Sequence, residues 1–287
     1  MNSVNITEVS VPTAQSALNG TLFTVSDEPS VAVVLNGATG VPRRFYRSFA
    51  RWLARERNAA CLIYDYQDAD APKAVMRRSR VTMQSWALDD QPAAQRYLRA
   101  LYPEVPFWVM GHSLGGIALS LHDAPERLDG VITVASGMAH VSDHPWPFQA
   151  VARLFWFGLG PLATRLMGYT PGAALGLGAD LPAGVYWNWR RWCVSPDFYQ
   201  SELGDTLPAY RPLPPEVNCT MFAFDDDVFI PPAPALRLAR FYNRSGDHLT
   251  VLSPANFGVD AIGHVGAFRE KNQSVWPALA EPIPRYH

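Results

Sequence analysis

Residues 107–116 read FWVMGHSLGG, an apolar run that enters a Gly-x-Ser-x-Gly motif centred on Ser113. The run is typical of a buried strand, and the composition of residues 114–122 predicts a helix. A strand that turns this abruptly into a helix brings two backbone segments so close that a Cβ would collide with the neighbouring chain, so glycines flank the serine. A Gly-x-Ser-x-Gly motif that arose by chance would not be expected to lie between a predicted strand and a predicted helix. We predict a tight turn that holds Ser113 away from the sheet.

Segments with strand and helix character alternate on both sides of this turn. Before it, we predict strands at residues 31–35, 60–64 and 106–110 and helices at residues 43–57 and 91–101. After it, we predict strands at residues 131–135, 219–224 and 248–252, a helix at residues 233–242 and a final helical stretch. Such alternation is typical of βαβ units. The predicted fold class is α/β, with a mostly parallel central sheet flanked by helices.

Residues 137–215 interrupt this alternation, and we call them the cap segment. The segment contains five of the nine tryptophans, namely Trp146, Trp156, Trp187, Trp189 and Trp192. Linkers are polar and poor in aromatic residues, so the cap segment should pack against something. We interpret it as an aromatic-rich helical cap, inserted between the sixth strand and the strand at residues 219–224 of a single domain that spans residues 1–287.

The charge balance argues against one class of partner. The chain has 24 Lys and Arg residues against 26 Asp and Glu residues, a net charge of −2, and the two signs are interspersed. A phosphate backbone or an anionic membrane attracts a concentrated basic surface, which this composition does not predict. We therefore expect no nucleic-acid partner and a small-molecule ligand instead.

The cysteines and the N-terminal residues indicate the cellular compartment of the protein. Cys61, Cys193 and Cys219 are odd in number, far apart and without CxxC spacing, as in proteins of reducing compartments. Residues 1–20 have neither the basic nor the apolar region of an export signal. The longest uncharged apolar stretch, residues 154–164, is shorter than the ~20 residues that span a bilayer. We predict a cytoplasmic protein without a transmembrane segment, although contact with a membrane surface stays open.

The predicted exposure of Ser113 points to a nucleophile, which needs a general base because a serine hydroxyl is weakly nucleophilic near neutral pH. In this topology the expected chain order is serine, acid, histidine, which leaves His248, His264 and His287. His248 begins a predicted strand and His287 ends the chain. We choose His264 because it lies in a loop of small residues, Gly263-His264-Val265-Gly266, after the last predicted strand.

The acid that orients the histidine should follow the strand at residues 219–224, where Asp225, Asp226 and Asp227 stand together. Asp227 is our first choice because it precedes a loop proline, Pro231, by four residues, and Asp226 is the alternate. Adjacent carboxylates repel one another, so the other two are expected to face solvent or to cap a turn.

Two backbone amides are expected to hold the negative oxygen of the reaction. The Leu114 amide follows the nucleophile, and the turn at residues 36–40, which reads NGATG, should supply the second donor. Our choice there is the amide of Ala38, with Thr39 next. His140 and His144 have i,i+4 spacing but no clear acidic third ligand, so we predict no metal and no organic cofactor.

These motifs together resemble the α/β-hydrolase fold serine hydrolases over nearly all of the chain after residue 20. More narrowly, the tryptophan-rich cap segment and the closing GHVGAFR of residues 263–269 are similar to a little-characterised bacterial branch, which is also similar to serine-dependent macrolide esterases. The resemblance implies carboxylic ester hydrolysis, and its narrower form implies opening of a macrolide antibiotic lactone, a resistance activity. The chain departs from the family at two places: Asn36 stands where many relatives carry histidine, and residues 64–68 lack the Arg-Gly that is common there.

The cap segment is expected to cover the carboxyl ends of the strands and to shape an apolar pocket. A bulky apolar ester or lactone is the expected substrate. The residues predicted to line the pocket are Thr39, Met138, Trp146, Trp156, Trp187 and Phe229. An acyltransferase or perhydrolase with the same triad, a non-catalytic ligand-binding module and a membrane-surface lipase are the alternatives, and the oligomeric state is open.

Overall fold

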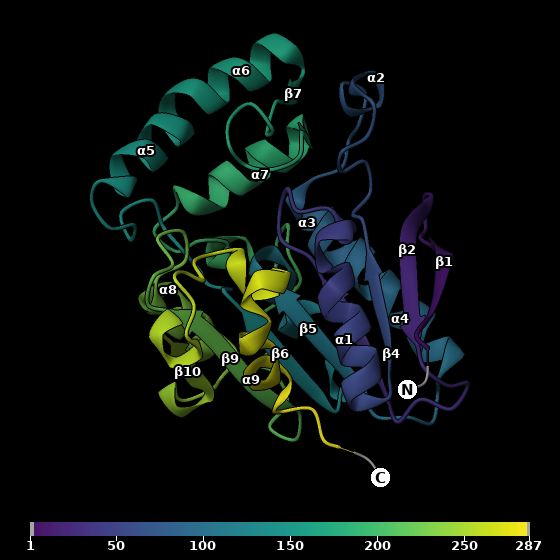
Figure 1. Cartoon of the computed structure of the whole chain (residues 1–287). Helices are drawn as coiled ribbons and strands as arrows, with labels where there is room; N and C mark the ends of the chain where they lie inside the picture. Colours follow the sequence, from purple (N-terminus) through teal and green to yellow (C-terminus); the bar gives the residue numbers. More distant parts are fainter. Residues whose placement is uncertain (1–2, 286–287) are drawn as a thin grey trace.

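The computed structural model describes residues 3–285, and an eight-stranded sheet lies at its centre (Figure 1). The strand order is β1-β2-β4-β3-β5-β6-β9-β10. The strands are β1 (Asn5–Pro12), β2 (Ala17–Thr24), β3 (Val31–Asn36), β4 (Ala59–Tyr64), β5 (Phe107–His112), β6 (Gly130–Val134), β9 (Asn218–Phe224) and β10 (Leu249–Leu252). The β1–β2 and β2–β4 pairs are antiparallel, and every pair from β4 to β10 is parallel. The predicted fold class is confirmed.

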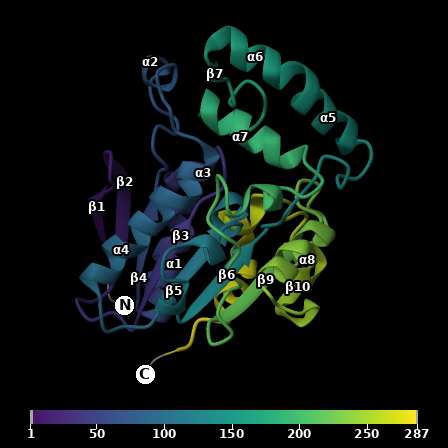
Figure 2. The same ribbon diagram turned by 180° about the vertical axis from the view of Figure 1, so that it is seen from behind.

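Helices cover both faces of the sheet (Figures 1 and 2), so the central strands β3, β4, β5 and β6 are buried on both sides. Two helices pack on one face, α1 (Arg47–Arg57) and α9 (Trp276–Ala280), and two on the other, α4 (Gln91–Leu101) and α8 (Pro232–Phe241). The side chains of β3 alternate between these layers. Val31 and Val33 belong to the core under α1, whereas Ala32 and Val34 belong to the core under α4.

Short helical segments complete the framework of the sheet. They are η1 (Arg43–Tyr46), α2 (Lys73–Met76), α3 (Met83–Ser85), η2 (Trp86–Asp90), η5 (Pro125–Arg127), η7 (Gln200–Glu202), η8 (Gly246–His248), η9 (Pro254–Phe257), η10 (Gly266–Phe268) and η11 (Glu270–Val275). The final helical stretch predicted from the sequence is therefore made of η10, η11 and α9.

The N-terminal hairpin of β1 and β2 was not predicted. β1 is an edge strand with most of its residues exposed or half-buried, so its sequence lacks the apolar alternation that marks a strand with one buried face. Pairing with β2 forms it instead, in a register that runs from Asn5 opposite Thr24 to Pro12 opposite Ala17.

The helix predicted at residues 114–122 is wrong. Two short turns stand there, η3 (Ser113–Gly116) and η4 (Leu119–Leu121). The backbone groups that a helix would pair internally are bonded to buried tyrosines from distant segments. Tyr242 donates its hydroxyl to the Gly116 carbonyl at 2.5 Å and accepts from the Leu119 amide at 2.9 Å, and Tyr199 donates to the Ile117 carbonyl. These partners replace the helical ladder, and two consecutive glycines favour the outcome.

Besides η7, the segment between β6 and β9 contains six elements, which lie above one end of the sheet (Figure 1). They are α5 (Phe148–Leu154), η6 (Phe155–Leu159), α6 (Gly160–Met167), β7 (Tyr169–Thr170), β8 (Leu181–Pro182) and α7 (Ala183–Cys193). Helices α5, η6 and α6 follow one another without a break. Within residues 3–285, no helix combines the length and the apolar character needed to cross a bilayer.

Candidate active site

Three side chains from distant parts of the chain meet in one hydrogen-bonded series. Ser113 follows β5, Asp227 follows β9, and His264 lies in the loop between η9 and η10. The Ser113 hydroxyl is 3.0 Å from His264 Nε2, and His264 Nδ1 is 2.8 Å from Asp227 Oδ2. The structure thus brings together the serine, the histidine and the first-choice acid. This is the geometry that lets an imidazole take a proton from a hydroxyl.

The turn that carries Ser113 is as tight as its glycines predict. Ser113 has a φ of +54°, a backbone conformation that costs energy for a residue with a side chain. A Cβ on Gly111 would lie 2.3 Å from the Gly115 carbonyl oxygen, and a Cβ on Gly115 would lie 2.2 Å from the Asn36 carbonyl oxygen. Both glycines are therefore steric requirements of the contact between β5, η3 and β3.

Asp227 is buried and fully bonded. Its Oδ1 accepts the amides of Phe229 at 2.8 Å and Ile230 at 3.0 Å, while Oδ2 faces His264. Burial by itself would raise the pKa of Asp227, but the charge and hydrogen bond of His264 and the two amides outweigh it, so the pKa lies below its ordinary value. The carboxylate is consequently ionised at neutral pH and can fix the orientation of the imidazole.

Asp226, the alternate acid, does not touch His264. Its two carboxylate oxygens accept the amides of Ile262 at 2.8 Å and Gly263 at 3.0 Å, the residues just before the histidine. The carboxylate therefore ties the histidine loop to the end of β9. The sequence pattern predicted a solvent-facing residue or a local cap instead, because the partners lie 36 and 37 positions away and leave no local signal.

His112, beside Ser113, is buried and belongs to a hydrogen-bond network with defined directions. A carbonyl can only accept, so His112 Nε2 donates to the His264 carbonyl at 2.8 Å, and the neutral ring accepts at Nδ1 from the Tyr46 hydroxyl at 2.8 Å. Burial, followed by the proximity of His264, lowers the pKa of His112 to about 3, so the ring is neutral. The Tyr46 hydroxyl in turn accepts the Ala38 amide at 2.8 Å. This chain of bonds joins the turn at residues 36–40 to the histidine loop.

That bond competes with the predicted role of the Ala38 amide as a donor to the reacting oxygen. The amide is already paired with Tyr46, and Ala38 is buried. Thr39, the second choice, lines the cavity beside Ser113 and Leu114, and within residues 3–285 its amide has no hydrogen-bond acceptor. Leu114 lies in the first turn of η3, where amides have no acceptor within the helix.

The cap segment touches the same turn. The Ala179 amide donates to the Gly40 carbonyl at 2.8 Å, and a Cβ on Gly40 would lie 2.3 Å from the Leu177 carbonyl oxygen. Gly40 has a φ of +74°, so glycine is required there by both conformation and space. The loop before β8 is therefore seated on the turn that carries Thr39.

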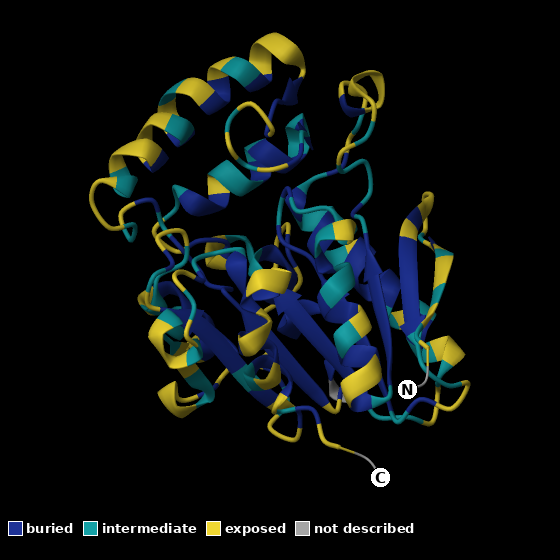
Figure 3. Ribbon diagram, viewed as in Figure 1, coloured by how far each residue is buried: buried dark blue, intermediate teal, exposed yellow. Residues whose placement is uncertain are grey.

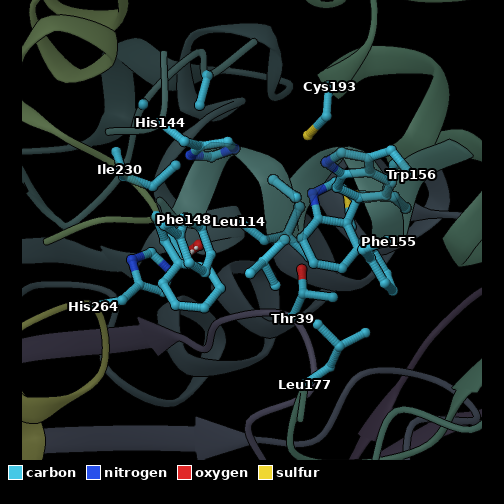
Figure 4. Close-up of a pocket in the computed structure, with 18 of the residues that line it drawn as sticks. Thr39, Leu114, His144, Phe148, Phe155, Trp156, Leu177, Cys193, Ile230 and His264 are labelled. Atoms are coloured by element: carbon cyan, nitrogen blue, oxygen red, sulfur yellow. Dashed lines mark hydrogen bonds between the residues drawn. The ribbon is translucent and has the colours of Figure 1, made fainter. Parts of the chain in front are cut away.

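A cavity of about 290 Å³ opens beside Ser113 (Figure 4). Its wall is mainly apolar and includes Met83, Ile117, Phe148, Phe155, Trp156, Trp189, Cys193, Phe198 and Phe229. Among the described residues, those that line it include no Asp, Glu, Lys or Arg. His144 and His264 are the titratable imidazoles of the wall, and burial lowers the pKa of His144.

Half of the six predicted wall residues line this cavity. Thr39, Trp156 and Phe229 do, and the other three do not. Trp146 is 79% exposed and points to solvent. Trp187 lies under the Arg165 guanidinium, whose carbon is 4.9 Å from the ring centre, on the other side of α7 from Trp189. Met138 is buried, and its carbonyl accepts from Arg237 at 2.9 Å.

The other histidines considered as a base or as metal ligands, where the structure describes them, have hydrogen-bond partners of their own. His140 Nδ1 is 2.7 Å from Ser142 Oγ, and His144 Nδ1 is 3.2 Å from the Val228 carbonyl, so the two rings have separate partners. Over residues 3–285, no three His, Cys, Asp or Glu side chains are grouped closely enough to hold a metal ion. His248 is paired with Ser245 at 3.1 Å, and His287 lies outside the described residues.

Comparison with known proteins bears on the fold. No family model matches the chain, and no curated protein sequence matches it significantly. Among solved structures, the 2-hydroxy-6-oxo-6-phenylhexa-2,4-dienoate hydrolase of a Rhodococcus species is similar over 98% of this chain and 99% of its own, with 17% identity and a TM-score of 0.60. The α/β hydrolase GrgF of a Penicillium species is similar over 97% of both chains, with 16% identity and a TM-score of 0.57.

An esterase of Pyrococcus furiosus is similar over 98% of this chain and 93% of its own, with 12% identity and a TM-score of 0.56. At these identities the likeness concerns the fold, which is that of the α/β hydrolases. The expected fold is confirmed. The narrower resemblance to macrolide esterases finds no support among these structures.

Proposed function

We propose that this protein is a serine-dependent carboxylic ester hydrolase that acts on an uncharged, apolar ester or lactone through an acyl-enzyme. The observation that carries the proposal is the series Ser113–His264–Asp227, with contacts of 3.0 and 2.8 Å, opening into an apolar cavity. Solved structures of the same fold that are named esterases and hydrolases agree with it.

The reaction follows from the hydrogen bonds. His264 Nε2 takes the proton of Ser113 as Oγ bonds to the ester carbon, and Asp227 stabilises the imidazolium that forms. The carbonyl oxygen becomes negative and is held by the amides of Leu114 and Thr39. His264 then returns the proton to the departing alkoxide as the ester bond breaks. A water repeats the sequence on the acyl-enzyme, giving the carboxylic acid and free Ser113.

The cavity wall supports an uncharged substrate. An ionised group would lose its hydration without gaining a paired charge, which costs several kcal/mol or about a thousandfold in affinity. The volume of about 290 Å³ is near the lower end of ligand cavities, which run from about 300 Å³ upward. A medium-length acyl chain or a single ring system fits such a space better than a decorated macrocycle. Macrolactone opening remains the narrower hypothesis, and it requires the cap segment to move.

A substrate panel tests the proposal. Aryl esters of increasing acyl length, esters with a carboxylate in the acyl group, amides and a macrolactone would be offered to the wild type and to Ser113→Ala. We expect turnover of neutral esters, labelling by a fluorophosphonate, and loss of both in the variant. Turnover that survives in Ser113→Ala would refute the proposal. Macrolactones left intact while aryl esters are cleaved would refute the narrower hypothesis alone.

A further inference from the structure

The outer face of the cap helices is an exposed apolar surface. Six large apolar side chains along α5, η6 and α6 are between 49% and 77% exposed, and we call them the cap ridge: Val151, Leu154, Phe157, Leu159, Leu162 and Leu166. Figure 3 shows exposed residues along the outer side of these helices. The inner side is packed, since Ala152, Trp156 and Thr164 are buried. A contiguous exposed apolar surface of this kind marks an interaction site.

Basic residues outnumber acidic ones beside the cap ridge, and the acidic residues Asp70, Asp143 and Asp180 lie just outside the two segments that hold the basic ones. Residues 144–179 contain Arg153 and Arg165 but no Asp or Glu, and residues 72–81 contain four basic residues and again no Asp or Glu. Those four are Lys73, Arg77, Arg78 and Arg80, and all are exposed. The two segments hold six of the 24 basic residues, so the rest of the chain has 18 basic residues against 26 acidic ones, a net charge of −8.

Contacts hold the basic segment beside the end of the ridge. Arg77 donates from Nε to the Met167 carbonyl at 2.9 Å, and its guanidinium lies 5.5 Å from the centre of the Tyr169 ring. Lys73 Nζ lies 5.9 Å from the same centre. Basic and acidic residues, which were expected to be interspersed, are therefore not interspersed at this part of the surface. The fold gathers positive charge at the cap and leaves the excess of negative charge elsewhere.

We propose that the cap ridge docks on an anionic lipid surface. A helix with Leu and Phe on its exposed side and Arg or Lys beside them is the composition of helices that lie in a membrane interface, where apolar burial and attraction to anionic headgroups add. A second copy of this chain fits the surface less well, because pairing two such faces would bring their basic residues together. Charge complementarity selects the anionic partner.

The position of the cavity gives the docking a use, and this step rests on the proposed function. Val151 belongs to the ridge and also lines the cavity, and Phe148 and Phe155 line it from the same helices. The helices of the ridge therefore form one wall of the cavity. A docked cap would hold this wall against the lipid, and an apolar ester could pass from the bilayer to Ser113 without crossing water.

Vesicle binding tests the docking with the full chain. The probes are vesicles of phosphatidylcholine alone or mixed with phosphatidylglycerol, at low and high salt. We expect binding to the anionic vesicles that weakens with salt. Leu162→Asp with Leu166→Asp should lower the partition coefficient more than tenfold. Arg78→Ala with Arg80→Ala should lower it by about fivefold for each residue.

Matched variants serve as controls. Leu101→Asp, at an α4 side chain that is 46% exposed, and Arg51→Ala with Arg240→Ala, at exposed basic residues outside the two segments, should bind like the wild type. Circular dichroism and thermal unfolding would show that each variant is folded. Hydrolysis of a water-soluble short ester should be unchanged in the ridge variants.

Three outcomes would overturn the docking proposal. The first is that anionic vesicles do not bind the wild type, and the second is that the ridge variants bind as well as the controls. The third is self-association in light scattering that the ridge variants abolish while vesicles bind nothing, which would identify a second copy as the occupant. Ser113→Ala should bind vesicles normally, so failure of the ester-hydrolase proposal would show separately, as intact docking without turnover.

Discussion

The neighbouring carboxylates Asp226 and Asp227 should separate stability from catalysis. Asp227→Asn keeps an oxygen for the amides of Phe229 and Ile230, which are 2.8 and 3.0 Å away, so folding should change little. It removes the charge that orients His264 and stabilises the imidazolium. Loss of this charge in such triads lowers kcat by about 10⁴-fold, or about 5.5 kcal/mol of transition-state stabilisation.

Asp226→Asn should have the opposite profile. The carboxylate accepts the amides of Ile262 and Gly263, and hydrogen bonds to a charged group contribute roughly 1.5–3 kcal/mol each. Asparagine retains one acceptor and turns an N–H against the other amide, so the free energy of unfolding should fall by about 2–3 kcal/mol. The histidine loop is loosened but remains, so kcat should fall by about tenfold or less.

The assay measures kcat and KM for a neutral aryl ester, with active sites counted by a fluorophosphonate, and thermal unfolding of both variants. Asp227→Ala and Asp226→Ala extend the pair, because alanine removes every carboxylate contact. The reasoning is wrong if Asp226→Asn lowers kcat as much as Asp227→Asn does. It is equally wrong if Asp227→Asn keeps most of the wild-type kcat.

Three further predictions follow from the contacts. Tyr46→Phe leaves the Ala38 amide and His112 Nδ1 without hydrogen-bond partners, so the free energy of unfolding should fall by about 1–3 kcal/mol for each group. We also expect a lower kcat at unchanged KM. A higher kcat would instead identify the Ala38 amide as the oxyanion donor. Burial raises the pKa of Asp90 from 3.8 to about 7, so the contribution of this group to stability is full below pH 3.8 and is lost as the pH rises to about 7, on the order of 4 kcal/mol. The difference in Tm between Asp90→Asn and the wild type should therefore grow in favour of the variant from pH 5 to pH 8. A difference that stays constant over this range would contradict the prediction. Trp189→Ala should shift kcat/KM toward larger acyl groups, whereas Trp146→Ala, at a 79% exposed side chain, should leave the preference unchanged; the same panel of esters detects either failure.

Several features could be predicted because neighbouring residues specify them. Gly111 and Gly115 mark the turn at Ser113 through sterics alone, and the helix predicted at residues 91–101 was found with those bounds because its apolar period is strong. The helix expected after Ser113 failed for a different reason. Its backbone partners are Tyr199 and Tyr242, which lie 82 and 126 positions from the carbonyls they bond.

Local pattern was thus sufficient for the parallel sheet and for the serine turn, since each depends on short-range sterics and apolar period. Contacts between distant residues decided the rest. The bonds of Asp226 to the histidine loop, the capture of the Ala38 amide by Tyr46 and the turning of Trp189 toward the cavity all depend on which surfaces meet when the layers pack. Adjacent residues of the same type look alike in a sequence, and the hydrogen bonds and burial of the folded chain make them different.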